Sequence, residues 1–109
     1  MNNQTIPELT ATLKRVAQQY SEEFGVTYNG DWFLLKLQEE LGEMTQKYLI
    51  MTNRTRRKPE SEELARAALA EEIADTFGYI LLLAEHLDID VEKAVLGKWL
   101  KYLNAAKEI

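Results

Sequence analysis

The sequence contains no cysteine and a single histidine, His86. The lack of cysteine excludes disulfide bonds, thiolate catalysis and cysteine-based zinc sites. One histidine is too few to build a histidine-rich metal centre. Any metal that this chain holds must therefore be bound mainly by oxygen ligands.

Long apolar runs and an excess of positive charge are also lacking. No stretch of about 18 apolar residues occurs, and the polar segment Met1–Thr5 has no apolar core of a signal peptide. We therefore expect no membrane span and a cytoplasmic location. The net charge of −5 provides no footprint for a nucleic-acid polymer. A length of 109 residues predicts one domain covering residues 1–109.

Apolar residues recur at helical spacing along the chain, and the alternation typical of strands is absent. The pattern predicts an all-α fold of four helices. A capping box at Thr5 starts the first helix, and Asp31 is the expected N-cap of the second. The segment Asp88-Ile89-Asp90 ends the third helix and caps the fourth. The expected ranges are 5–24, 31–51, 62–87 and 91–103, with a polar, mobile connection at 52–62.

The segment Phe77–Ala84, in the third helix, is apolar almost all round. A helix of this kind is buried on more than one side. Because so short a chain has few other helices to cover it, we expect a subunit interface in a homodimer or tetramer.

Two acidic pairs stand out on these helices. Glu40 and Glu43 belong to the second helix, and Glu72 and Asp75 belong to the third. The i,i+3 spacing places each pair on one helix face. Two like charges about 4 Å apart repel by roughly 4 kcal/mol at an effective dielectric constant of about 20. Acids that converge in this way usually hold a cation, and carboxylate oxygens suit Mg²⁺, Mn²⁺ or Ca²⁺.

A plainer interpretation is that these acids are solvated and pair with lysines. It suits the second helix, where Lys36 and Glu40, and Glu43 and Lys47, have i,i+4 spacing. On the third helix no basic residue lies three or four positions from either acid.

The acids of the third helix share a face with Leu82 and Leu83, which are typical core residues. Burying an unpaired carboxylate is very costly. Glu72 and Asp75 therefore make the stronger case for a metal site.

Other known site types do not fit. The chain has no Glu-x-x-His motif of a ferritin-like bundle, no EF-hand loop and no phosphate loop of the P-loop NTPases. His86 lies near the end of the third helix, where an interaction with the helix dipole accounts for it.

At the two acidic motifs the chain resembles the MazG-like nucleotide pyrophosphohydrolases of the all-α NTP pyrophosphatase superfamily. That family is marked by Glu-Glu-x-x-Glu followed by Glu-x-x-Asp. Here residues 39–43 read Glu-Glu-Leu-Gly-Glu, and residues 72–75 read Glu-Ile-Ala-Asp. The resemblance covers about residues 30–104.

The resemblance implies an oligomeric, four-helix bundle-type domain that hydrolyses nucleoside triphosphates to monophosphate and pyrophosphate. Mg²⁺, or Mn²⁺, is implied as the cofactor, with Glu40, Glu43, Glu72 and Asp75 as ligands. Glu39 either orients the attacking water or is simply solvated.

The resemblance also implies basic residues and an asparagine late in the fourth helix, where they face the phosphates. Lys98, Lys101 and Asn104 occupy that region, with solvated lysines as the alternative. A second candidate for recruiting phosphate is the connection, which is otherwise a solvated linker; its basic residues are Arg54, Arg56, Arg57 and Lys58. Four aromatic residues at core spacing are candidates for stacking on a base: Trp32, Tyr48, Tyr79 and Trp99.

Three functions remain open at this point. The first is a general (deoxy)nucleoside triphosphate pyrophosphohydrolase that removes noncanonical or surplus nucleotides. The second is a phosphoribosyl-ATP, dCTP or dUTP pyrophosphohydrolase on the same fold. The third is an inactive helical oligomerisation module whose acids are structural.

Overall fold

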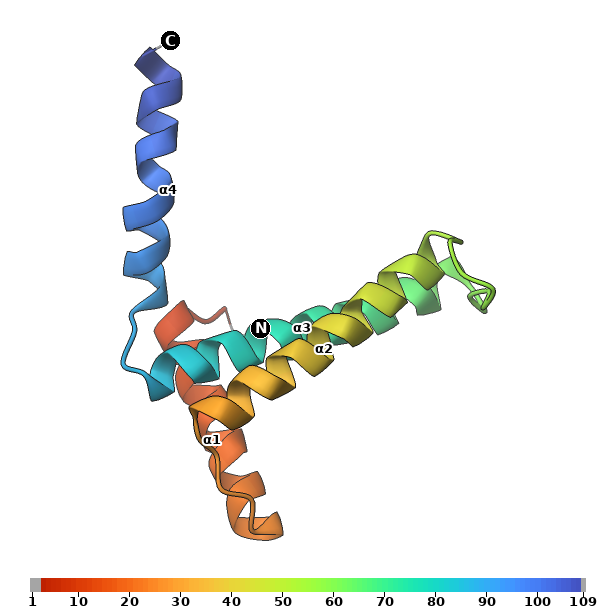
Figure 1. Ribbon diagram of the computed structural model, residues 1–109, viewed down its shortest axis with the longest axis horizontal. Helices are drawn as coiled ribbons and strands as arrows, with labels where there is room; N and C mark the ends of the chain where they lie inside the picture. The colour runs from red at the N-terminus through yellow and green to blue at the C-terminus, as the bar shows by residue number, and fades with distance from the viewer. Residues whose placement is uncertain (1–2, 109) are drawn as a thin grey trace.

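The computed structural model describes residues 3–108, and the side chains of residues 3–103. It consists of four α-helices: α1 (Ile6–Phe24), α2 (Gly30–Met51), α3 (Glu62–His86) and α4 (Val91–Glu108) (Figure 1). No strand occurs between residues 3 and 108. The predicted all-α class is confirmed.

Local capping sets most of the helix boundaries. At α1 the Thr5 hydroxyl accepts from the Glu8 N–H at 3.3 Å, and the Glu8 carboxylate accepts from the Thr5 N–H at 3.1 Å. Gly25 ends α1 in the left-handed conformation, with φ 68°. The Ser61 hydroxyl caps α3, and the Asp90 carboxylate caps α4 by accepting from the Lys93 N–H at 3.0 Å.

The start of α2 differs from the prediction. Its N-cap is Asn29, whose side chain accepts from the Trp32 N–H at 2.8 Å, whereas Asp31 lies inside the first turn. A Cβ atom on Gly30 would lie 3.5 Å from the imidazole of His86. Gly30 therefore lies beside the end of α3, at a distance that is an ordinary van der Waals contact for a Cβ atom.

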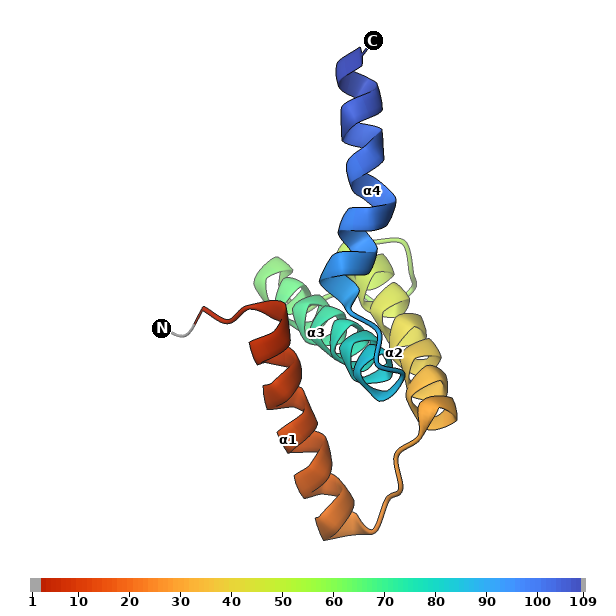
Figure 2. The ribbon, with the colours of Figure 1, turned by 90° about the vertical axis from the view of Figure 1, so that its left-hand side faces the viewer.

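Helices α2 and α3 form an antiparallel hairpin, α1 packs across α3, and α4 projects away from the other three (Figures 1 and 2). Gly78 of α3 lies under Leu13 of α1, which a Cβ atom would meet at 3.6 Å. The buried apolar side chains come from α2 and α3: Phe33, Ala65, Leu81, Leu82 and Ala84.

Within one chain the apolar segment Phe77–Ala84 is covered on only part of its circumference. Leu81 is 1% exposed, but Phe77 and Ile80 remain substantially exposed. Because α4 stands apart, the four helices do not close into a bundle in a single chain. The predicted bundle-type oligomer therefore stays a prediction. Among the helices between residues 3 and 108, none is long and apolar enough to cross a membrane.

We expect Leu81→Ala to lower the free energy of unfolding by about 2–5 kcal/mol, because it leaves a cavity at the most buried large side chain. Leu64→Ala is the matched control, since Leu64 is exposed and its truncation should cost less than about 1 kcal/mol. Denaturant unfolding at one protein concentration measures both. Equal losses would contradict the assignment of Leu81 to the core.

Candidate metal and phosphate site

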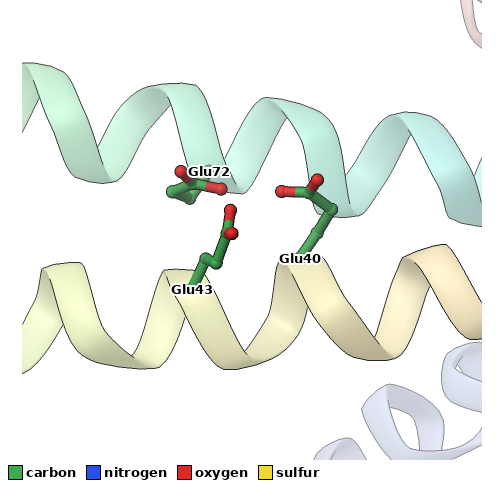
Figure 3. A group of neighbouring side chains, drawn as sticks. All are labelled: Glu40, Glu43 and Glu72. Carbon is green, nitrogen blue, oxygen red and sulfur yellow. The ribbon is translucent and has the colours of Figure 1, made fainter.

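Packing of α2 against α3 brings three carboxylates together. Glu40 and Glu43 point from α2 toward Glu72 of α3, between the two helices (Figure 3). One carboxylate oxygen of each residue lies within 4.8 Å of those of the other two. We refer to Glu40, Glu43 and Glu72 as the acid cluster.

Asp75, the fourth predicted ligand, lies at the edge of the acid cluster. It is exposed on α3, and it is not one of the three residues whose oxygens share that 4.8 Å limit. Its negative charge nevertheless acts on Glu40 and raises the pKa of that carboxyl group. Asp75 therefore lies close enough to the acid cluster to act on it electrostatically.

Glu40 is the most deeply buried member, with 8% of its surface exposed. Its pKa is raised to about 7, chiefly by burial, then by the adjoining Glu72 carboxyl and by repulsion from Glu43 and Asp75. At neutral pH the cluster is therefore balanced between holding a proton on Glu40 and carrying a further negative charge.

Two oxygens of the cluster have no hydrogen-bond partner among the residues that the structure describes. Oε2 of Glu40 and Oε2 of Glu72 are both buried from solvent and unpaired. Such atoms are costly unless a cation or a proton satisfies them. An all-oxygen set of converging carboxylates fits Mg²⁺ or Mn²⁺, so the residues present agree with the metal that the motifs implied.

The nearby lysine does not neutralise the buried acid. Lys36 pairs with Glu39 at 3.2 Å, on the solvent side of α2. In the part of the chain with described side chains, neither the Lys36–Glu40 pair nor the Glu43–Lys47 pair forms. The sequence predicted that the acids of the third helix lie against the core and that those of the second helix fit a solvated surface. This prediction was wrong, because Glu40 of α2 is more buried than Glu72 or Asp75 of α3.

The predicted phosphate-binding lysines are not brought to the acid cluster. Lys98 and Lys101 are exposed on α4, which projects away from the hairpin (Figure 2). The side chain of Asn104 lies outside the described residues. The basic connection 54–58 lies at the tip of the hairpin, roughly 12 Å along α2 beyond Glu43. Glu39 is exposed and is bound to Lys36.

An aromatic cavity of about 320 Å³ lies between α1, α2 and α3. Asp75 and Lys36 are among its lining residues, whereas no member of the acid cluster lines it. Of the four aromatic candidates, Trp32 and Tyr79 line this cavity, with ring centroids 5.9 Å apart, and the other two do not. Further aromatic side chains of the lining are Tyr20, Tyr28 and Phe33.

Sequence reasoning missed Tyr28, Phe33 and Lys36 as site residues. The available signal was the density of aromatic residues between positions 28 and 33, directly upstream of the first acidic motif. Tyr28 stacks on Phe33 with ring centroids 5.4 Å apart, which fixes one wall of the cavity.

No protein-family model matches this chain, and no curated protein matches it either. The likeness to the MazG-like enzymes therefore rests on the two acidic motifs and their order. A function can therefore be assigned only from the geometry of the acid cluster and its surroundings.

We expect the metal-free protein to lose stability as pH rises from about 4.5 to about 7. Over this range the folded state holds a proton on Glu40 that the unfolded chain has released, because the folded pKa is about 7 and the ordinary value is 4.5. Below that window both states are protonated, and above it both are ionised, so the loss is complete.

Glu40→Gln should remove this loss and melt at a higher temperature than the parent protein near pH 8. Melting curves in a chelator at about pH 5 and about pH 8 measure the effect. The control Glu23→Gln removes an exposed acid of α1 and should keep the pH dependence of the parent. A parent protein whose melting temperature rises across the window relative to Glu40→Gln would contradict the burial of this carboxyl.

Proposed function

We propose that the chain is a nucleotide pyrophosphohydrolase that cleaves nucleoside triphosphates to monophosphate and pyrophosphate. The cofactor is Mg²⁺ or Mn²⁺, bound by Glu40, Glu43, Glu72 and Asp75. Removal of noncanonical or surplus nucleotides is the role that such an activity fits.

The observation that carries the proposal is the pair of unpaired buried oxygens, Oε2 of Glu40 and Oε2 of Glu72. A purely structural acid would be paired or exposed, because a buried carboxylate oxygen without a partner is costly. Here both residues belong to the acid cluster, in which one carboxylate oxygen each of Glu40, Glu43 and Glu72 lies within 4.8 Å of the others. Their arrangement supports a role in binding a divalent cation.

The aromatic cavity supports a nucleotide as the substrate. Trp32 and Tyr79 offer apolar ring faces on which a base can stack, and stacking of this kind is worth about 1–3 kcal/mol per base. Asp75 lines the cavity, and its charge also raises the pKa of Glu40 in the acid cluster. A base in the cavity would therefore place the attached phosphates toward the acids.

The chemistry requires that water add to a phosphorus atom while the anhydride bond between the α- and β-phosphates breaks. One bound divalent ion would neutralise charge on the phosphates and lower the pKa of a bound water. The chain's own acids hold that ion, because a bare acid cluster would repel a triphosphate. Binding of that ion would also favour the ionised form of Glu40, whose pKa burial and the neighbouring acids raise to about 7 in the metal-free chain.

A panel of triphosphates tests the proposal. The purified protein is incubated with Mg²⁺ and each common and noncanonical (deoxy)nucleoside triphosphate, and the products are identified. Release of pyrophosphate and monophosphate is the expected result. Including dCTP, dUTP and phosphoribosyl-ATP separates a general enzyme from the narrower alternatives. No release from any nucleotide, with no thermal shift on adding Mg²⁺ or Mn²⁺, would instead support a helical oligomerisation module.

We expect Glu43→Gln and Asp75→Asn each to lower kcat by at least about 100-fold, because each removes a negatively charged oxygen ligand. Both side chains are exposed, so the helical fold should be retained. Pyrophosphate release and circular dichroism measure the two effects.

Glu71→Gln is the matched control, because Glu71 is an exposed acid next to Glu72 but outside the acid cluster. It should keep turnover within about 3-fold of the parent. Near-normal turnover in either ligand variant would remove that residue from the metal site.

A further inference from the structure

A small pocket lies at the tip of the hairpin, where α2 and α3 meet the connection between them (Figure 1). Its volume is about 240 Å³, below the roughly 300–1,000 Å³ of pockets that hold drug-sized ligands. Lys47, Arg57 and Lys58 line it, and Glu60 is the only acid among the described residues of the lining. We refer to it as the tip pocket. Its size and charge suit a small anionic group rather than a whole nucleotide.

The three cations of the tip pocket form no ion pair within residues 3–103, whose side chains the structure describes. Segment 44–59 contains five basic residues and no acid, although the whole chain has a net charge of −5. Like charges gathered in this way repel one another, so an anion that binds between them is stabilised. Apolar residues make up the rest of the lining and leave fewer water molecules to screen the cations. They are Ile50, Pro59, Leu64, Ala65 and Ala68.

The connection that supplies two of these cations is held by its own hydrogen bonds. The Arg54 N–H donates to the Leu49 carbonyl at 2.9 Å, and the Thr55 hydroxyl donates to the Arg57 carbonyl at 3.0 Å. A segment that is already ordered loses less conformational entropy when a ligand binds. The tip pocket is therefore formed before any anion arrives.

The tip pocket, the acid cluster and the aromatic cavity follow one another along the same face of the hairpin. On α2, Lys47 comes four residues after Glu43, which is about one helical turn, or roughly 6 Å. On α3, Ala68 of the tip pocket precedes Glu72 by the same interval. The aromatic cavity lies beyond the acids in the opposite direction, with Lys36 in its lining. The acids therefore separate an aromatic cavity at one end from a cationic pocket at the other.

This order matches the order of groups in a nucleoside triphosphate. With a base in the aromatic cavity and the first phosphate at the acid cluster, the rest of the phosphate chain continues toward the tip. We propose that the tip pocket binds the two terminal phosphates of the substrate, and that Lys47, Arg57 and Lys58 hold the pyrophosphate as it leaves. The proposal rests on the proposed function, because it assigns a subsite of the same reaction. Cations at this position also stabilise the negative charge that develops on the leaving group.

Two neighbouring arginines provide a matched kinetic test. Arg57 and Arg56 are both exposed, but only Arg57 lines the tip pocket. Arg57→Gln and Lys47→Gln should each lower kcat/KM for a triphosphate at least about 10-fold, because each removes a charge-assisted hydrogen bond to phosphate. Arg56→Gln removes the same charge and should stay within about 3-fold of the parent at 0.15 M salt, where charges more than about 8 Å apart are largely screened. Equal losses in Arg57→Gln and Arg56→Gln would overturn the proposal, because the general charge of the connection would then account for them.

A binding measurement does not depend on catalysis. In calorimetric titrations with Mg²⁺ present, pyrophosphate should bind the parent and Arg56→Gln alike, and Arg57→Gln at least about 10-fold more weakly. A nucleoside monophosphate should bind all three proteins equally, because its single phosphate ends at the acid cluster. The proposal is wrong if pyrophosphate does not bind the parent, or if Arg57→Gln weakens monophosphate binding as much as pyrophosphate binding.

The two proposals fail in different ways. Pyrophosphate binding that depends on Arg57, without hydrolysis of any triphosphate, would count against the proposed function alone. Hydrolysis with the parent's kcat/KM in both Lys47→Gln and Arg57→Gln would overturn the role of the tip pocket and leave the proposed function standing.

Discussion

The packing of α2 against α3 forces like charges together, and the rest of the molecule must compensate for this. Oxygens of the acid cluster lie within 4.8 Å of one another, a separation at which two full charges repel by about 3–4 kcal/mol at an effective dielectric constant of about 20. Apolar packing holds the helices together on both sides of the cluster. Phe33 and Leu82 are buried toward one end, and Ala65 is buried toward the other. The spacing of the two helices at the acid cluster is therefore fixed. A proton on Glu40 or a bound cation, rather than separation of the helices, relieves the repulsion between the carboxylates.

Capping boundaries could be predicted because they depend on a few neighbouring residues. The reciprocal bonds of Thr5 and Glu8, and the cap at Asp90, follow from side chains three positions apart. The start of α2 could not be predicted in this way, because Asn29 and Asp31 are both suitable N-cap residues. In the folded chain Asn29 is the cap, next to Gly30, which lies beside His86 of α3. That contact joins residues far apart in sequence, so local spacing does not reveal it.

In the candidate site, too, local spacing predicts some features, whereas others depend on tertiary packing. Helical spacing placed Glu40 with Glu43, and Glu72 with Asp75, on common faces. It did not reveal which acid is buried, because that depends on the axial stagger of α2 along α3. The i,i+4 spacing favours an ion pair between Lys36 and Glu40, but Lys36 pairs with Glu39 instead. The position of α4 was equally hidden, since it depends on the short turn at Asp88, which adopts φ 57°.

Two features of the single chain remain uncompensated. The hairpin carries excess negative charge around the acid cluster, and α4, which carries positive charge, leaves large apolar side chains exposed. Any ligand that binds only the folded state stabilises it in proportion to the logarithm of its concentration over its Kd. A divalent cation at the acid cluster would be such a ligand, because it would lower the repulsion between the three carboxylates. Its binding would be coupled to folding, because the oxygens of Glu40 and Glu72 that lack a partner are brought together and buried only when α2 packs on α3.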